Sequence, residues 1–87
     1  MARKTHIIVV RWASAPKADD LQKTLPGTWL RFNSGVWLLK SSLSSEQIDD
    51  RINREGLGID EIMIIELLPD TKYGWAEQWI WEWIDKD

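Results

Sequence analysis

The chain has 87 residues, of which 14 are acidic and 11 basic, so its net charge is −3, and it contains no cysteine. A chain of this length forms one domain near the lower limit for folding without disulfides or metals, and the lack of cysteine excludes disulfides and thiolate metal sites. Its apolar runs are too short for a membrane span or a signal peptide, so we expect a cytoplasmic protein that does not bind membranes.

The charges are unevenly distributed along the chain. Residues 1–40 hold seven basic and two acidic side chains, whereas residues 41–87 hold four basic and twelve acidic ones. Two interpretations remain open. Both sets form one mixed, solvated surface, or the basic half binds nucleic acid or an acidic partner.

The first half of the chain predicts a strand, a short helix and a β-hairpin. Residues 6–12 are β-branched and almost continuously apolar, as in a strand covered on both faces. Pro16 and the helical spacing of apolar residues up to Leu25 predict a short helix that stops at Pro26 and Gly27. The aromatic-rich runs 28–32 and 36–40 are separated by Asn-Ser-Gly and predict the hairpin.

The second half predicts a helix, a strand and a further helix. Ser44 and Gln47 match a capping box at a helix start, and Ile48 and Ile52 supply the buried stripe of that helix. Residues 62–68 predict a fourth strand, closed by Pro69 and Asp70. A last helix is predicted over residues 75–85, although the alternation of Trp79, Trp81 and Trp83 is also compatible with a strand.

This order of elements predicts an α+β fold, the ferredoxin-like β-α-β-β-α-β sandwich with a four-stranded antiparallel sheet and an added C-terminal helix. We expect a single domain over residues 1–87, with its core in 5–68 and the tryptophan-rich helix in 74–86. The first and third strands would be central. The long, apolar fourth strand would then lie at an edge, where either the tail covers it or another chain pairs with it.

Seven tryptophans are present, and four of them fall in the last thirteen residues. Each can bury about 150–250 Å², which is more aromatic area than a domain this small can hide. We therefore expect a homodimer, and a further protein partner, with Trp79 and Trp83 as anchors. The alternative is that the tail only covers its own sheet. The predicted interface comprises Trp75, Trp79, Trp81, Trp83, Ile64 and Glu66.

No residue type points clearly to catalysis. His6 is the only histidine, and without a second ligand it is expected to be structural. The serines have no base beside them. The acidic pairs at 19–20, 49–50 and 60–61 are adjacent in sequence and point apart on a helix, so we interpret them as solvated. We predict no catalytic residue, no metal and no cofactor.

One mixture of basic and aromatic side chains could contact nucleic acid. It comprises Arg11, Arg31, Lys40 and Trp37, together with Trp12, Trp29 and Phe32. Aromatic rings among cations stack on single-stranded nucleic acid. Packing within the sheet is the alternative explanation, and the acidic character of the whole chain argues against broad affinity for phosphate.

Three segments resemble a group of small bacterial and phage proteins described as SinR-like. The segments are the helix start Leu-Ser-Ser-Glu-Gln-Ile at residues 43–48, the strand Asp-Glu-Ile-Met-Ile-Ile-Glu at 60–66, and the Gly-Trp…Trp-Ile tail. The fold of that group resembles the small CRISPR adaptation subunit and the VapD-like ribonucleases. The resemblance implies a ferredoxin-like homodimer.

The chain departs from this pattern at the end of the first strand. In the nuclease-like relatives a Tyr-Asp pair stands there, and the aspartates of two subunits hold a divalent metal. This chain has Arg11 and Trp12, and neither can bind a hard cation. We therefore expect a non-catalytic adaptor or regulator from a phage or mobile element. The alternatives are a metal-dependent ribonuclease that uses Asp19 or Asp20, and a small nucleic-acid-binding module.

Overall fold

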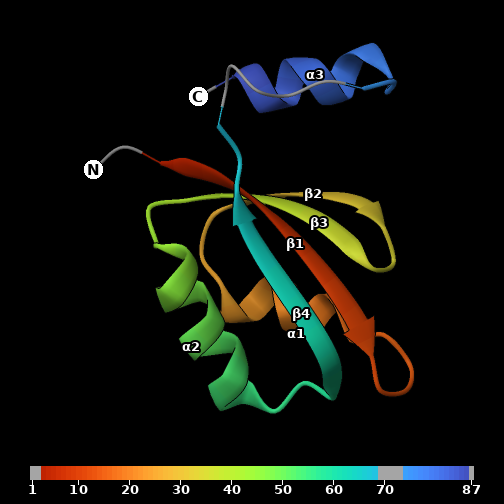
Figure 1. Ribbon diagram of the computed structural model, residues 1–87, viewed down its shortest axis with the longest axis vertical. Helices are drawn as coiled ribbons and strands as arrows, with labels where there is room; N and C mark the ends of the chain where they lie inside the picture. Colours follow the sequence, from red (N-terminus) through yellow and green to blue (C-terminus); the bar gives the residue numbers. More distant parts are fainter. Residues whose placement is uncertain (1–2, 69–73, 87) are drawn as a thin grey trace.

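The structure is a computed structural model that describes residues 3–68 and 74–86. The predicted order of elements is confirmed (Figure 1). In chain order the elements are β1 (Lys4–Trp12), α1 (Ala18–Thr24), β2 (Thr28–Asn33), β3 (Val36–Ser41), α2 (Ser45–Glu55), β4 (Ile59–Glu66) and α3 (Gln78–Asp85).

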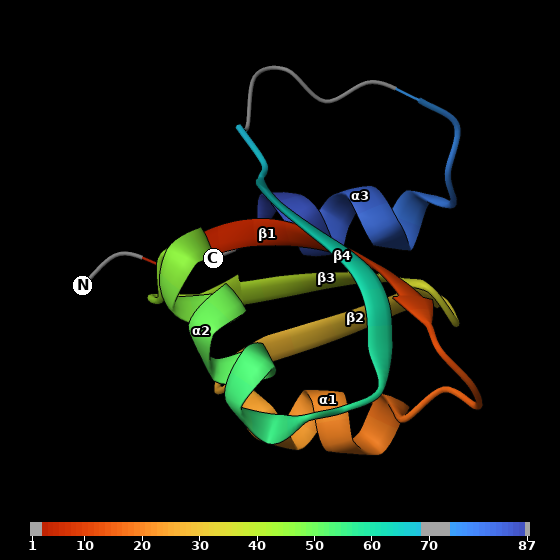
Figure 2. The same cartoon turned by 60° about the horizontal axis from the view of Figure 1, so that its bottom comes forward.

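The four strands form one antiparallel sheet in the order β2-β3-β1-β4. β1 and β3 are therefore central and β2 and β4 form the edges, as the ferredoxin-like prediction requires. Helices α1 and α2 cover one face of the sheet, and α3 lies on the opposite face (Figures 1 and 2). None of the helices in residues 3–68 and 74–86 is long and apolar enough to cross a membrane.

The main hydrophobic core lies between the sheet and helices α1 and α2. Alternate residues of β1, namely His6, Ile8 and Val10, are buried on this face. Burial of an aliphatic side chain such as Ile8 or Val10 contributes roughly 1.5–3 kcal/mol to stability. The core consists of Ile8, Val10, Leu21, Leu25, Trp37, Leu39, Ile48, Ile52 and Leu57.

The predicted capping box of α2 is confirmed. The Ser44 hydroxyl accepts a hydrogen bond from the backbone amide of Gln47 at 3.1 Å. The Gln47 side chain accepts one from the backbone amide of Ser44 at 2.9 Å. The helix ends at Gly56, whose left-handed backbone (φ +58°) closes the last turn.

Several predicted boundaries were wrong. β1 starts at Lys4 rather than residue 6, and β4 runs from Ile59 to Glu66 rather than from residue 62 to 68. The earlier start of β4 follows from the pairing of Ile59 with Trp12 at the end of β1. The hairpin loop has two residues rather than three, since Asn33 joins β2. α3 starts at Gln78 rather than residue 75, and its helical form settles the helix-or-strand alternative. The predicted stop at residues 69–70 lies outside the described residues.

Candidate interaction surface

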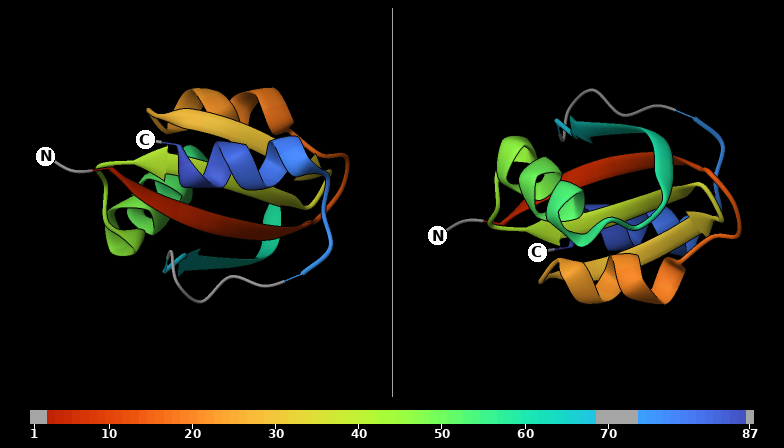
Figure 3. Two further views of the ribbon diagram at one scale, coloured as in Figure 1. Left: turned by 90° about the horizontal axis from the view of Figure 1, so that it is seen from above. Right: turned by 90° about the horizontal axis from the view of Figure 1, so that it is seen from below.

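The face of the sheet that α1 and α2 do not cover is also apolar. Cross-strand pairing places Ile7 beside Leu38 and Ile65, and Val9 beside Met63. These residues alternate with the core residues and therefore point to the opposite side. Among the described elements, only α3 lies over this face (Figure 3).

α3 covers one half of this face and leaves the other half open. It runs over β3 and beside β2, away from β4 (Figure 3). Leu30 and Leu38 under the helix are only 5% and 7% exposed. Met63 and Ile65 on β4 are 57% and 48% exposed. The uncovered half is therefore an apolar strip along the β4 edge.

A buried lysine holds α3 to the sheet. Lys40 on β3 is 6% exposed, and its ammonium donates hydrogen bonds to the backbone carbonyls of Trp83 and Lys86. The same Nζ lies 4.4 Å from the centre of the Trp83 ring. A cation at a helix C-terminus is favoured because it satisfies carbonyls that lack helical partners and opposes the helix dipole. We call this contact the Lys40 latch.

The tryptophans of the tail lie in different environments. Trp83 and Trp81 are half-buried, whereas Trp79 is 52% exposed and Trp75 is fully exposed. The Trp79 indole N–H donates to the carboxylate of Glu77 at 2.7 Å. The tail therefore both covers its own sheet, through Trp83, and presents indole surface to solvent.

The remaining predicted interface residues, Ile64 and Glu66, lie on β4 at the opposite edge of the sheet from β2. Ile64 packs partly against the core, and Glu66 is exposed. The six predicted interface residues thus fall into two groups, one on α3 and the segment before it, and one on the β4 edge.

The outer edge of β4 has free backbone hydrogen-bonding groups among the described residues. The Leu67 amide donates to Thr5 at 2.8 Å, and the register continues this pairing through Ile7–Ile65 and Val9–Met63. In an antiparallel ladder the intervening residues point their N–H and C=O groups away from the partner strand. The groups of Ile62, Ile64 and Glu66 therefore face outward.

The two glutamates beside this apolar edge form ion pairs with basic residues of the same chain. Glu66 lies 3.4 Å from the ammonium of Lys4, and Glu61 lies 3.1 Å from the guanidinium of Arg11. Both pairs are exposed and contribute little to stability. They do reduce the local negative charge beside Met63 and Ile65.

The end of β1 is occupied by packing and ion-pair contacts. Arg11 forms the pair with Glu61. The Trp12 indole donates to the carbonyl of Ser34 at 3.0 Å and meets the ring of Trp37 edge to face at 6.1 Å. These side chains tie β1 to β4 and to the hairpin.

The residues predicted to contact nucleic acid are not brought together on one surface. Trp37 is fully buried in the core, and Lys40 is buried under α3. Arg31 stacks over the Trp37 ring at 5.9 Å, on the side of α1 and α2. Arg11 belongs to the other face of the sheet. Among the basic residues of this set only Arg11 and Arg31 are exposed, and they lie on opposite faces of the sheet; Phe32 is 54% exposed.

His6 is fully buried beside the start of α2. Its Nε2 lies 3.0 Å from the carbonyl of Leu43, so Nε2–H donates and Nδ1 is left as the acceptor facing the Ser45 hydroxyl at 3.4 Å. Burial lowers the pKa of His6 below its ordinary value of 6.5, against the opposing effect of the Leu43 carbonyl and Glu66. A neutral histidine at this position joins β1 to the α2 cap.

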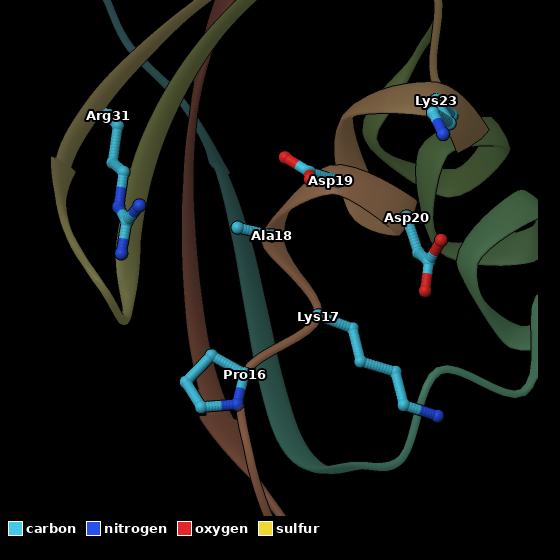
Figure 4. A pocket seen from close by; sticks show the side chains of 7 residues that line it. All are labelled: Pro16, Lys17, Ala18, Asp19, Asp20, Lys23 and Arg31. Carbon is cyan, nitrogen blue, oxygen red and sulfur yellow. The ribbon is translucent and has the colours of Figure 1, made fainter.

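The acidic pair at residues 19–20 lies in the exposed first turn of α1, beside an open hollow of about 560 Å³ (Figure 4). The two carboxylates point to different sides, and Lys17, Lys23 and Arg31 also line the hollow. Within residues 3–68 and 74–86, no three His, Asp or Glu side chains are close enough together to hold a metal ion.

The Lys40 latch was missed in the sequence, where Lys40 counted only as a basic residue. One signal could have indicated it. Val36, Leu38 and Lys40 occupy alternate positions on one strand, so Lys40 belongs to the same apolar face as the other two. An apolar sheet face is normally buried by another apolar segment, and the tryptophan-rich tail is the segment that remains for this role.

Comparison of the chain with protein families, with curated proteins and with solved structures finds no match.

Proposed function

We propose that this protein is a non-catalytic adaptor or regulator in the cytoplasm, which acts through self-association and through contacts with another protein. The observation that carries this proposal is the amount of apolar surface left in solvent. Large exposed apolar residues of this kind are typical of interaction sites. They are Phe32, Met63, Ile65, Leu68, Trp75 and Trp79, with exposed fractions from 48% to 102%.

The resemblance to the SinR-like group extends the proposal to a nuclease-like scaffold carried by a phage or mobile element. In that group the metal depends on a carboxylate at the end of the first strand. Here Arg11 is ion-paired with Glu61, and Trp12 packs against Trp37. A cation placed there would be repelled by the guanidinium and would find no ligand on the indole. This supports a function in binding rather than hydrolysis.

A cleavage assay tests the non-catalytic part. Labelled RNA and DNA are incubated with the purified protein and Mg²⁺ or Mn²⁺, and we expect no products. Cleavage that survives purification and disappears in Asp19→Ala or Asp20→Ala would replace the proposal with a metal-dependent ribonuclease. Binding that weakens steeply with salt and requires Arg31 would instead favour a nucleic-acid-binding module.

A capture experiment tests the interaction part. Tagged protein is isolated from its host, and the co-purifying proteins are identified. We expect a specific partner that is retained by an Arg51→Ala/Arg54→Ala control on the exposed side of α2. The Trp75→Ala/Trp79→Ala variant should lose it, because both indoles are exposed. Equal recovery with both variants would contradict a role for the tail.

A further inference from the structure

We propose that a second copy of this chain pairs with the outer edge of β4, antiparallel to it, around a two-fold axis at Ile64. One continuous sheet would then run through both protomers. This inference rests on the proposed function, because it names the surface through which the protein associates with itself.

The outer edge of β4 is complementary to itself. Ile62, Ile64 and Glu66 point their N–H and C=O groups outward, and no described residue pairs with them. A second copy related by a two-fold axis presents the same groups in reverse order. With the axis at Ile64, that residue forms a hydrogen-bonded pair with its own copy, and Ile62 pairs with Glu66 on both sides.

The positions of the carboxylates along β4 select the register of this pairing. An axis at Met63 would pair residues 60–66 of both copies, but it would set Asp60 directly opposite Glu66 twice. Like charges in directly opposite positions destabilise a sheet. An axis at Ile65 would leave only residues 64–66 of β4 paired within both copies, because the strand ends at Glu66. An axis at Ile62 would pair residues 59–65, but it would set the carboxylate of Glu61 directly opposite Met63 in both copies. The axis at Ile64 avoids both arrangements and keeps residues 62–66 paired.

The pairing also buries exposed apolar side chains. With the axis at Ile64, Met63 of each copy lies opposite Ile65 of the other, on the sheet face that α3 leaves open. Such non-hydrogen-bonded pairs bring the side chains into close contact. Met63 and Ile65 are 57% and 48% exposed in the single chain, so each would gain a partner.

The other edge strand is less suited to this pairing. β2 is six residues long, and its register shifts between Arg31 and Asn33. Such irregularities and an exposed arginine are devices that protect edges. β4 has eight residues, and its flanking carboxylates Glu61 and Glu66 are already paired with cations of β1.

Cysteine cross-linking tests the register, since the chain has no cysteine of its own. Met63→Cys and Ile65→Cys are prepared singly and as a mixture refolded together, then oxidised mildly. We expect disulfide dimers in the mixture and not in either variant alone, because only the pair 63–65 is directly opposite. Thr28→Cys on the β2 edge is the control for random collision. Cross-linking within one variant alone, or none above this control, overturns the proposal.

Sedimentation of Met63→Lys/Ile65→Lys provides a second test. Both side chains are exposed, so the monomer should fold, while lysines on the edge should raise the dimer dissociation constant at least about tenfold. Met63→Leu is the matched control and should dimerise as the original chain does. If the wild-type chain is a dimer but the mixture gives no 63–65 disulfide, only the proposed strand pairing is wrong. If the wild-type chain is a monomer, self-association is also removed from the proposed function.

Discussion

Replacement of Lys40 by methionine should release α3 from the sheet while the rest of the domain stays folded. Lys40 is 6% exposed, and its ammonium reaches two carbonyls at the C-terminal end of α3 and the ring of Trp83. Methionine has a similar length and fills the space, but it cannot donate hydrogen bonds. The substitution therefore removes the Lys40 latch without opening a large cavity.

The size of the effect follows from opposing contributions. Hydrogen bonds from a charged donor contribute about 1.5–3 kcal/mol each, and a cation over an aromatic ring adds about 0.5–2 kcal/mol. Removal of the ammonium from water costs several kcal/mol, and the apolar contact with Trp83 survives in the variant. We expect a net loss of about 2 kcal/mol in docking free energy, which is roughly a 30-fold increase in the undocked population.

Hydrogen exchange measured residue by residue is the assay. α3 has eight residues, and isolated helices shorter than about 12–15 residues are not stable in water, so an undocked α3 should lose its protection. The Lys86 amide, which donates to Glu82, should exchange roughly 30-fold faster in Lys40→Met. The amides of β1 should change little, and the exposed Lys23→Met should leave α3 unaffected. Unchanged α3 protection in folded Lys40→Met would refute the latch.

Four further substitutions test the fold. Gly27→Ala should cost about 2–4 kcal/mol, because the added Cβ would lie 2.3 Å from the Lys40 carbonyl oxygen at φ +143°. Gly56→Ala, at φ +58° with nothing within 4 Å, should cost only about 1 kcal/mol, and equal losses in urea unfolding would contradict this. The depressed pKa of His6 means that the unfolded chain binds the proton more readily, so stability should fall as pH drops below 6.5. His6→Gln should flatten that slope, and an unchanged slope would exclude His6 as its source. Ser44→Ala should cost about 1 kcal/mol by removing the α2 cap, and a neutral effect would contradict the capping-box role.

Features that depend on neighbouring residues could be predicted from the sequence. The Ser44–Gln47 capping box and the buried pair Ile48 and Ile52 follow from spacing along one helix, and the structure confirms both. The order of strands and helices gave the ferredoxin-like topology, since few other arrangements of these elements bury their apolar faces.

Features that depend on distant residues could not be predicted in this way. The start of β4 is set by its pairing with the far end of β1, where Arg11 meets Glu61 and Trp12 meets Ile59. The burial of Lys40 depends on α3, which is 38 residues further along the chain at its first residue, Gln78. Local pattern shows that such residues are charged or apolar, but it does not show which surface will cover them.

The different environments of the tail tryptophans could not be predicted from the sequence either. Trp79 and Trp83 are four residues apart and share one side of a helix, which predicted a common role. In the structure Trp83 lies against Lys40, while Trp79 is 52% exposed. Their proposed roles at a dimer interface therefore differ. Trp83→Ala should act through the docking of α3, and Trp79→Ala through contacts outside the protomer.

The most direct test of self-association is sedimentation velocity of the unmodified chain over a dilution series in the micromolar range. We expect a species of twice the 10.2 kDa chain mass, which dissociates on dilution and is lost in Met63→Lys/Ile65→Lys. A monomer of 10.2 kDa at every concentration, unchanged by these substitutions and by Trp83→Ala, would contradict it.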